Sequence, residues 1–153
     1  MIHKKGDFKK GLFRPRNRNK YIGREYPIYR SSWELHFFKW CDSNPNVLEW
    51  AAECVVIPYK SPIDEKVHRY FVDNVIVLKE GDKTVKYLIE IKPFKQTLPP
   101  VPSKRKKRDT LIHEQVTYEI NKVKWEAANS WAKLNGYKFV ILTENELFNG
   151  KKS

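Results

Sequence analysis

The sequence has little cysteine, no internal repeat and no long apolar run, and each absence excludes a class of protein. Only Cys41 and Cys54 occur in 153 residues, too few for a disulfide framework, and with four scattered histidines they match no zinc-binding spacing. No apolar run approaches the roughly 20 residues needed to cross a bilayer, and the N-terminus has no apolar signal region. We therefore expect a cytosolic protein with reduced thiols and one well-packed domain.

Acidic residues are scarce in two segments, and the excess positive charge is confined to them. Residues 1–20 carry eight basic residues against Asp7, and residues 95–109 carry six against Asp109. Together they account for the whole net charge of +12. This concentration favours nucleic acid as a partner over the simpler interpretation of a solubilising tail. The candidate DNA-binding side chains are Lys4, Lys5, Lys9, Lys10, Arg14, Arg16, Arg18, Lys20, Lys104, Arg105, Lys106, Lys107 and Arg108.

The patterns along the chain predict an α/β domain between a short arm and a short tail. Residues 1–25 are basic and lack apolar periodicity, so we expect an extended, flexible arm, then a single domain over 26–149 and a tail over 150–153. Ser31 is placed to cap a first helix, and Gly81-Asp82 predicts a tight hairpin turn. The predicted order is α-β-β-β-α-β, a mixed sheet flanked by helices. Its elements are a helix from Ser31 to the NPN at 44–46, strands over 53–59, 69–78 and 84–92, a helix over 111–134 and a strand over 137–144.

The helix over 111–134 has the clearest periodicity, because its apolar residues advance by four or three positions. Gly136 is placed to end it. Gln115, just after the basic loop, is a candidate to position a water or a phosphate, although an ordinary surface glutamine is the simpler interpretation. The predicted apolar stripe comprises residues 112, 116, 120, 123, 127, 131 and 134.

Three charged residues on two predicted strands form the candidate site. With Gly81-Asp82 as the turn, the hairpin register places Asp73 opposite Glu90, with Cβ atoms about 5 Å apart on one face of the sheet. Lys92 follows Glu90 by two residues and shares that face. Opposed carboxylates among apolar neighbours repel unless a cation separates them. The alternative is that both acids are edge charges with local lysine partners, but the opposed aspartate and the charge distribution favour a site.

The chemistry of these residue types points to phosphodiester hydrolysis. Mg²⁺ takes a few carboxylate oxygens, its own waters and a substrate phosphate. Lys92, near a metal-bound water and a phosphate, can help to deprotonate the water or stabilise the pentavalent charge. Glu34 has two interpretations that spacing does not separate. It completes a capping box with Ser31, or it turns inward as a third acidic ligand.

Three stretches, YFVDNVIV, LIEIKP and NKVKWEAANSWAKLNGYKFVILTE, resemble the restriction-endonuclease-like PD-(D/E)xK family, in particular the branch containing the transposon endonuclease TnsA. The resemblance implies a restriction-endonuclease-like core and a metal-dependent endo- or exodeoxyribonuclease. It assigns Asp73, Glu90 and Glu34 as ligands of Mg²⁺, with Mn²⁺ as a substitute, and Lys92 as a catalytic residue. Val72 stands where the family name expects proline, a departure that weakens the likeness more than the mechanism.

The chain also resembles the head-completion nucleases of T-even-type tailed phages. This resemblance implies a role after DNA packaging, in preparing the filled head for tail joining, with DNA and phage head or neck proteins as partners. It implies action in the cytoplasm of the infected bacterium or association with the virion. The alternative is a non-catalytic, DNA-binding head–tail connector that retains a decayed site. Intact Asp73, Glu90 and Lys92 favour the enzyme.

Overall fold

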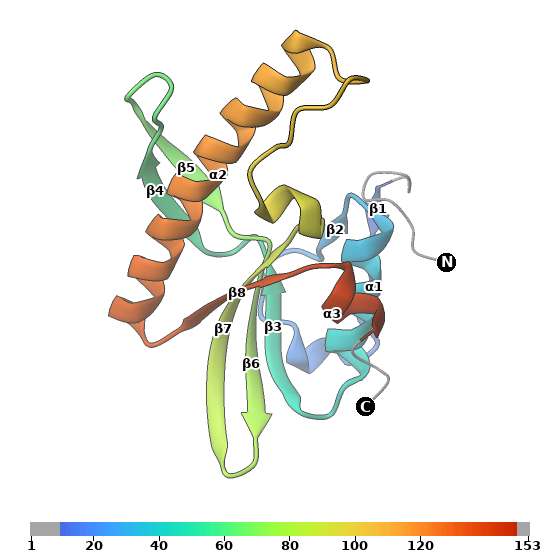
Figure 1. Cartoon of the computed structure of the whole chain (residues 1–153). Helices are drawn as coiled ribbons and strands as arrows, with labels where there is room; N and C mark the ends of the chain where they lie inside the picture. The colour runs from blue at the N-terminus through green and yellow to red at the C-terminus, as the bar shows by residue number, and fades with distance from the viewer. Residues whose placement is uncertain (1–9, 150–153) are drawn as a thin grey trace.

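The central feature of the fold is a four-stranded mixed sheet. The computed structural model describes residues 10–149, and within them the sheet has the strand order β3-β6-β7-β8 (Figure 1). β6 pairs antiparallel with β3 and β7, whereas β8 lies parallel to β7. A parallel return needs a long crossover, which a helix between β7 and β8 provides. The strands are β3 (Val47–Ala52), β6 (Asn74–Glu80), β7 (Lys83–Ile91) and β8 (Lys138–Leu142).

Helices cover both faces of this sheet. α1 (Ser32–Ser43) and the short α3 (Glu144–Asn149) pack on one face. α2 (Arg108–Asn135) packs on the other face with a two-stranded sheet of β4 (Val56–Lys60) and β5 (Val67–Phe71) (Figure 1). The predicted mixed sheet flanked by helices is therefore confirmed. No helix within residues 10–149 is long and apolar enough to span a membrane. The remaining elements are β1 (Gly11–Leu12), β2 (Ile28–Tyr29) and the 3₁₀ turns η1 (Arg18–Lys20) and η2 (Phe94–Thr97).

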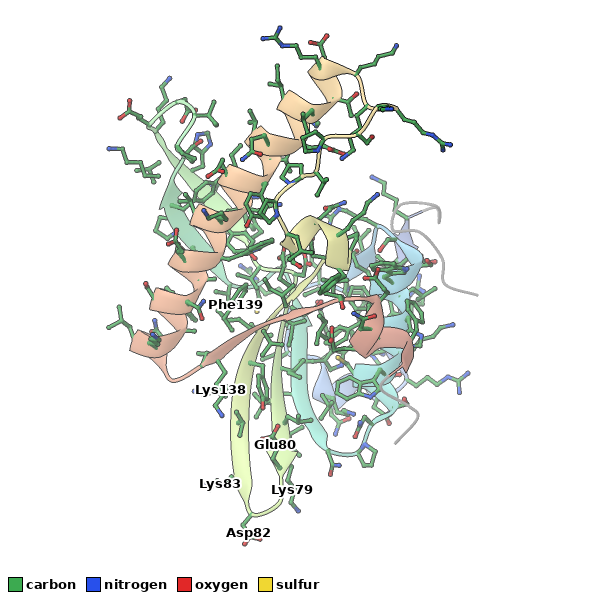
Figure 2. All side chains as sticks on the ribbon, in the orientation of Figure 1. Lys79, Glu80, Asp82, Lys83, Lys138 and Phe139 are labelled. Atoms are coloured by element: carbon green, nitrogen blue, oxygen red, sulfur yellow. The ribbon has the colours of Figure 1, made fainter. Side chains whose placement is uncertain are left out.

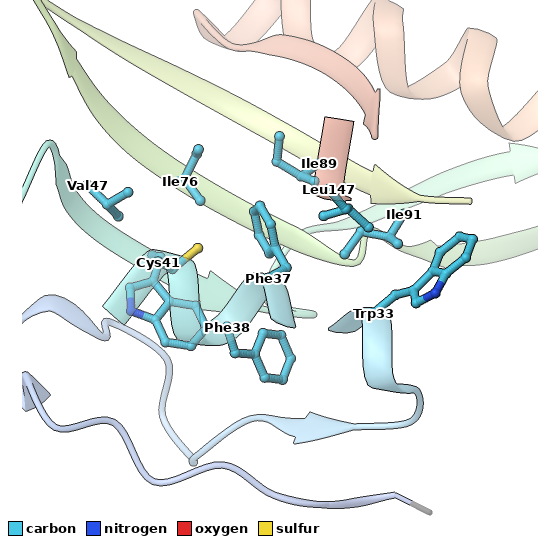
Figure 3. Close-up of a cluster of buried hydrophobic side chains, with 10 residues drawn as sticks. Trp33, Phe37, Phe38, Cys41, Val47, Ile76, Ile89, Ile91 and Leu147 are labelled. Atoms are coloured by element: carbon cyan, nitrogen blue, oxygen red, sulfur yellow. The ribbon is translucent and has the colours of Figure 1, made fainter. Parts of the chain in front are cut away.

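Two clusters of buried side chains, one on each face of the sheet, form the core. Figure 3 shows the first, in which Phe37 of α1 lies against Ile89 and Ile91 of β7. Side chains alternate along a strand, so Leu88 and Glu90 point to the opposite face, toward α2. Leu88 accordingly belongs to the second cluster, with β4, β5 and α2. The acid of the candidate site therefore faces the long helix.

The buried face of α2 differs from the predicted stripe. Trp125, Ala128 and Ala132 are buried against the sheet, whereas Leu134, at the end of the predicted stripe, is 85% exposed. The true face lies one residue, or about 100°, from the predicted one. The physical reason is close approach, because the two small alanines let the helix axis come near the sheet and Trp125 fills the remaining volume. The largest aliphatic side chains therefore do not mark the contact.

The predicted strand over 69–78 is divided in the structure. β5 ends at Phe71 and β6 begins at Asn74, so Asp73 lies outside both strands. Its carbonyl oxygen accepts a hydrogen bond of 3.0 Å from the Glu53 N–H. The chain leaves the β4–β5 hairpin at this break and enters the central sheet. Asp73 is thus held at the junction of the two sheets.

Strand β3 was not predicted. Its register against β6 shifts between Val47 and Glu49, which marks a bulge, and Trp50 and Ala51 are buried on opposite faces. The bulge and the two-sided burial remove the alternation that identifies a strand in sequence. The predicted strand over 53–59 corresponds to the later β4.

Residues 10–25, predicted to belong to the arm, lie on the body of the protein. The buried Asp42 carboxylate accepts two hydrogen bonds of 2.9 Å, from the backbone N–H groups of Arg16 and Asn17. Lys20 Nζ donates to the carbonyl oxygens of Asp42 and Asn44, at 3.1 Å and 2.8 Å. The segment is therefore anchored at the end of α1.

Aromatic packing adds to this anchor. The rings of Phe13 and Tyr21 lie 6.0 Å and 4.8 Å from that of Trp50, which is fully buried. These two aromatic residues explain why a segment that reads as a basic arm packs on the domain, since their burial is favourable and the cations remain outside. Outside the described residues lie the predicted DNA-binding residues Lys4, Lys5 and Lys9 and the predicted tail over 150–153.

The β6–β7 hairpin has the predicted turn. Glu80 pairs with Lys83 around Gly81-Asp82, and Gly81 has a φ of +61°, which glycine adopts without strain. The tip projects from the body with Lys79, Asp82 and Lys83 near its end (Figure 2), and Glu80 accepts a hydrogen bond of 2.6 Å from the Tyr87 hydroxyl. The register follows from this turn, and Asn74 pairs with Ile89 as the prediction requires.

Candidate active site

Glu90 is the buried centre of the candidate site. It lies one residue before the end of β7, points toward α2, and is 5% exposed. Its Oε1 accepts a hydrogen bond of 2.6 Å from the hydroxyl of Tyr70, on β5. Its Oε2 lies 3.5 Å from Lys92 Nζ, which shares the face as predicted. Each oxygen of this buried carboxylate therefore has a partner, a hydroxyl for one and an ammonium for the other.

Asp73 lies beside the same end of β7. Its Oδ2 accepts a hydrogen bond of 2.7 Å from the backbone N–H of Ile91, the residue that follows Glu90. The β6–β7 register, extended by one residue from Asn74–Ile89, sets Asp73 across from Glu90. The structure therefore brings Asp73, Glu90 and Lys92 together at the junction of the two sheets.

The pKa of Tyr70 responds to its burial and to the two neighbouring acids. Burial raises the pKa of this phenol far above its ordinary value, and the negative charge of Glu90, the hydrogen bond to it and the charge of Asp73 raise it further. Tyr70 therefore remains a neutral hydroxyl that donates to Glu90. Its effect is to hold the carboxylate in one orientation.

Lys124, on α2, lies beside the site, and the sequence patterns did not reveal it. Its Nζ lies 5.3 Å from the ring centre of Tyr70 and 5.7 Å from that of Tyr59. Burial lowers the pKa of Lys124, while the charges of Glu90 and Asp73 raise it and that of Lys92 lowers it. The ammonium therefore lies in the field of all three predicted site residues.

A weak signal for Lys124 exists in the sequence. It follows the buried Asn121 by three residues and precedes the buried Ala128 by four, so it lies on the buried face of α2. A lysine on such a face is unusual unless it has a partner. The signal depends on the correct stripe, and the predicted stripe was displaced by one residue.

Glu34 acts at the start of α1. The Ser31 hydroxyl accepts a hydrogen bond of 3.2 Å from the Glu34 N–H, and Glu34 Oε1 accepts one of 2.7 Å from the Arg30 N–H. The first bond caps α1 at Ser31, as predicted, whereas the carboxylate accepts from Arg30, the residue before the cap, where a capping box would use the Ser31 N–H. Arg30 pairs with Glu53, which is the main reason that its pKa is raised, and the charges of Glu34 and Asp73 raise it further. Arg30 thus lies in the field of both Glu34 and Asp73.

The other predicted residues are not at the junction. Gln115 is exposed and donates to Glu119 at 2.8 Å, and it precedes Lys124 by nine residues, or roughly 13 Å of helix. Lys106 pairs with Glu114 at 2.8 Å, within an otherwise exposed basic loop. The structure thus separates the candidate phosphate-binding loop from the acids.

A cleft of about 830 Å³ adjoins the junction. Arg30 and Glu53 line it together with Tyr21, Arg24 and Tyr26. Within residues 10–149, no group of three or more acidic, histidine or cysteine side chains is arranged to hold a metal ion. Asp73 and Glu90 are the carboxylates of the predicted site at this junction, and Mg²⁺ takes one or two carboxylates beside waters and phosphate oxygens.

Comparison with known proteins identifies the family. Residues 44–144 match the TnsA-like endonuclease N-terminal domain, a span that contains Asp73, Glu90, Lys92 and Lys124. The chain is also 43% identical over 143 residues to the head completion nuclease of Enterobacteria phage T4, a match that covers 90% of this chain and 92% of that protein. The chain therefore belongs to the family of TnsA-like endonuclease N-terminal domains.

Proposed function

We propose that this chain is a divalent-metal-dependent DNA nuclease that hydrolyses phosphodiester bonds. The observation that carries the proposal is the convergence of Asp73, Glu90 and Lys92 at the end of β7. Membership of an endonuclease domain family supports it, as does the similarity to a phage head completion nuclease. Two acids and a lysine that meet beside a buried strand end are the groups that a metal-assisted hydrolase needs.

Asp73 and Glu90 would hold the metal ion. When bound, Mg²⁺ or Mn²⁺ would supply a Lewis acid at the scissile phosphate and lower the pKa of a coordinated water. The family resemblance adds Glu34, whose carboxylate accepts a hydrogen bond from the Arg30 N–H just before α1, so we assign it a supporting role beside Arg30. The two site carboxylates come from different segments and are each held by a hydrogen bond, which fixes their geometry before substrate arrives.

Lys92 would serve the reaction directly. Its Nζ lies 3.5 Å from Glu90, and the side chain is partly exposed, so it can reach a phosphate oxygen next to the acids. There it would stabilise the negative charge that develops on the pentavalent phosphorus and help to orient the attacking water. Tyr70 would keep Glu90 in place through the hydrogen bond that its hydroxyl donates to Oε1.

The basic segments would bind the DNA backbone. Lys10, Arg14, Arg16 and Arg18 are exposed along the N-terminal segment, and the loop Lys104–Arg108 is exposed except for Lys106. Cations of this kind bind phosphates without regard to sequence and make affinity depend on salt. Lys20 is already bonded to backbone carbonyls of α1 and its neighbour, so we assign it to structure more than to DNA.

We further propose that the cleavage serves phage head completion, after DNA packaging, with phage head or neck proteins as partners in the infected bacterium. The similarity to the head completion nuclease of Enterobacteria phage T4 over nine-tenths of the chain supports this stage. The alternative function is that of a DNA-binding connector without catalysis. It would need the same basic segments, but it would not need Asp73, Glu90 or Lys92.

Digestion of plasmid DNA by the purified chain, in Mg²⁺ or in EDTA, tests the proposal. We expect cleavage only with the metal, and we expect Lys92→Ala to lose most of it while retaining the fold and DNA binding. Cleavage by Lys92→Ala at the wild-type rate would show that the site is misassigned. DNA binding without any cleavage by wild type would favour the connector.

A further inference from the structure

Lys124 has an unusual position for a lysine on a helix surface. Its Nζ lies between two tyrosine rings, those of Tyr59 on β4 and Tyr70 on β5, at 5.7 Å and 5.3 Å from their centres. The side chain is half-buried, and it forms no ion pair within 4.0 Å among the described residues. Two aromatic faces attract an ammonium and restrict its motion. The two uncharged rings thus position the ammonium near the junction of the sheets and leave its positive charge unbalanced.

The surroundings of Lys124 contain the candidate catalytic residues. The charges of Glu90, Lys92 and Asp73 all influence its pKa, which burial lowers. Glu90 already has partners for both oxygens, in Tyr70 and Lys92. Lys124 is therefore not needed to satisfy that carboxylate. A half-buried ammonium that lacks a carboxylate partner carries a cost in desolvation, which an anionic ligand would offset.

The charges at the junction indicate a role for Lys124 beside Lys92. Asp73 and Glu90 together neutralise one divalent cation, and Lys92 balances the single charge of a phosphodiester. The pentavalent transition state carries one further negative charge, which a second cation at the junction would balance. Burial lowers the pKa of Lys124 and the charges of Glu90 and Asp73 raise it, and its Nζ lies 5.3 Å from the ring centre of Tyr70, the residue that donates a hydrogen bond to Glu90.

We propose that Lys124 is a second cationic catalytic residue, which contacts a non-bridging oxygen of the scissile phosphate in the transition state. This inference rests on the proposed nuclease function and names a residue of that same site. Tyr59 and Tyr70 act as positioning residues that aim the ammonium. The cation comes from α2, whereas Glu34 lies on α1, on the opposite face of the sheet.

The test compares Lys124→Met with Lys122→Met in the full chain. Methionine keeps most of the side-chain volume and removes the charge. Lys122 is a matched control because it lies on the same helix, above the ring of Tyr118 at 5.7 Å, but pairs with Glu119 at 4.0 Å, away from the acids. Single-turnover cleavage of a labelled duplex in Mg²⁺ gives the rate constant at saturating protein, and binding in EDTA gives the affinity.

We expect Lys124→Met to lower the saturating rate constant by about 10²- to 10³-fold, the usual effect of removing one preorganised donor, with affinity changed less than about threefold. Lys122→Met should match wild type in both. Lys124→Arg should recover part of the rate, because it restores a cation over the tyrosine rings. A readout without turnover is acylation in EDTA, in which bound duplex should slow modification of Lys124 in the wild-type chain.

A rate constant for Lys124→Met within threefold of wild type would overturn the proposal, as would acylation of Lys124 that DNA leaves unchanged. An equal fall in rate for Lys124→Arg and Lys124→Met, with a lower melting temperature in both, would assign Lys124 to packing and also overturn it. The proposed function is judged separately. An active wild type with inactive Lys92→Ala supports the nuclease whatever Lys124 does.

Discussion

Removal of one hydroxyl, by Tyr70→Phe, should destabilise the protein measurably. The substitution keeps the buried ring, and therefore the packing of β5 and the cation–π contact with Lys124. It removes only the 2.6 Å hydrogen bond to Glu90 Oε1. Glu90 is 5% exposed, so water does not readily replace the lost donor. A hydrogen bond to a charged group contributes roughly 1.5–3 kcal/mol, and its loss should lower the melting temperature by roughly 3–12 °C.

The dependence on pH gives a second signature of the same bond. The folded-state pKa of Tyr70 is raised far above the value of about 10 that an unfolded chain has. Above pH 10 the unfolded state releases this proton and the native state keeps it, so the stability that Tyr70 contributes is present below pH 10 and falls as the pH rises beyond it. Phenylalanine has no such proton. The stability gap between wild type and Tyr70→Phe should therefore narrow above pH 10.

Thermal unfolding followed by circular dichroism, at pH 7 and at several values above 10, measures both effects. Tyr118→Phe is a suitable control, because Tyr118 is a partly exposed residue of α2 and a surface hydroxyl contributes less than about 0.5 kcal/mol. A melting temperature for Tyr70→Phe within about 1 °C of wild type at pH 7 would show that Glu90 is not held as a buried, charged acceptor. The role of Tyr70 in holding the Glu90 carboxylate would then be refuted.

Two further predictions concern the anchor of the N-terminal segment and the basic loop. Asp42→Ala removes the acceptor of two backbone N–H groups, each at 2.9 Å, and should lower the free energy of unfolding by about 2–4 kcal/mol in urea titrations. A change below about 0.5 kcal/mol would mean that the segment is not anchored there. Replacement of all five residues of Lys104–Arg108 by glutamine should weaken DNA binding and flatten its dependence on salt concentration, because phosphate contacts release counterions. Equal salt slopes for the two proteins would show that this loop does not contact DNA.

Local signals predicted the parts of the fold that depend on a few adjacent residues. Ser31 caps α1, Gly136 ends α2 with a φ of +77°, and the Gly81-Asp82 turn sets the register of β6 and β7. The site could be predicted from this register, because a two-residue turn determines which residues of the two strands are opposite. Glu90 and Lys92 are consequently on the predicted face.

The parts that were not predicted depend on contacts between segments far apart in sequence. The bulge in β3 hides that strand, and the break at Asp73 arises because the chain changes from one sheet to another. Lys124 and Tyr70 reach Glu90 only when α2 and β5 are placed on the sheet. Side-chain size at the helix–sheet contact decides that placement, and apolar periodicity in α2 indicated a face one residue away.

Single-turnover cleavage by wild type and by Asp73→Asn shows whether Asp73 and Glu90 form a metal-dependent nuclease site. Asparagine keeps an oxygen that can accept the 2.7 Å hydrogen bond from the Ile91 N–H, so the fold at the junction should survive while the negative charge is lost. We expect Mg²⁺-dependent cleavage of a labelled duplex by wild type and a rate at least about 10³-fold lower for Asp73→Asn, with unchanged DNA affinity in EDTA. Cleavage by Asp73→Asn at the wild-type rate, or no cleavage by wild type in Mg²⁺ or Mn²⁺, would contradict it.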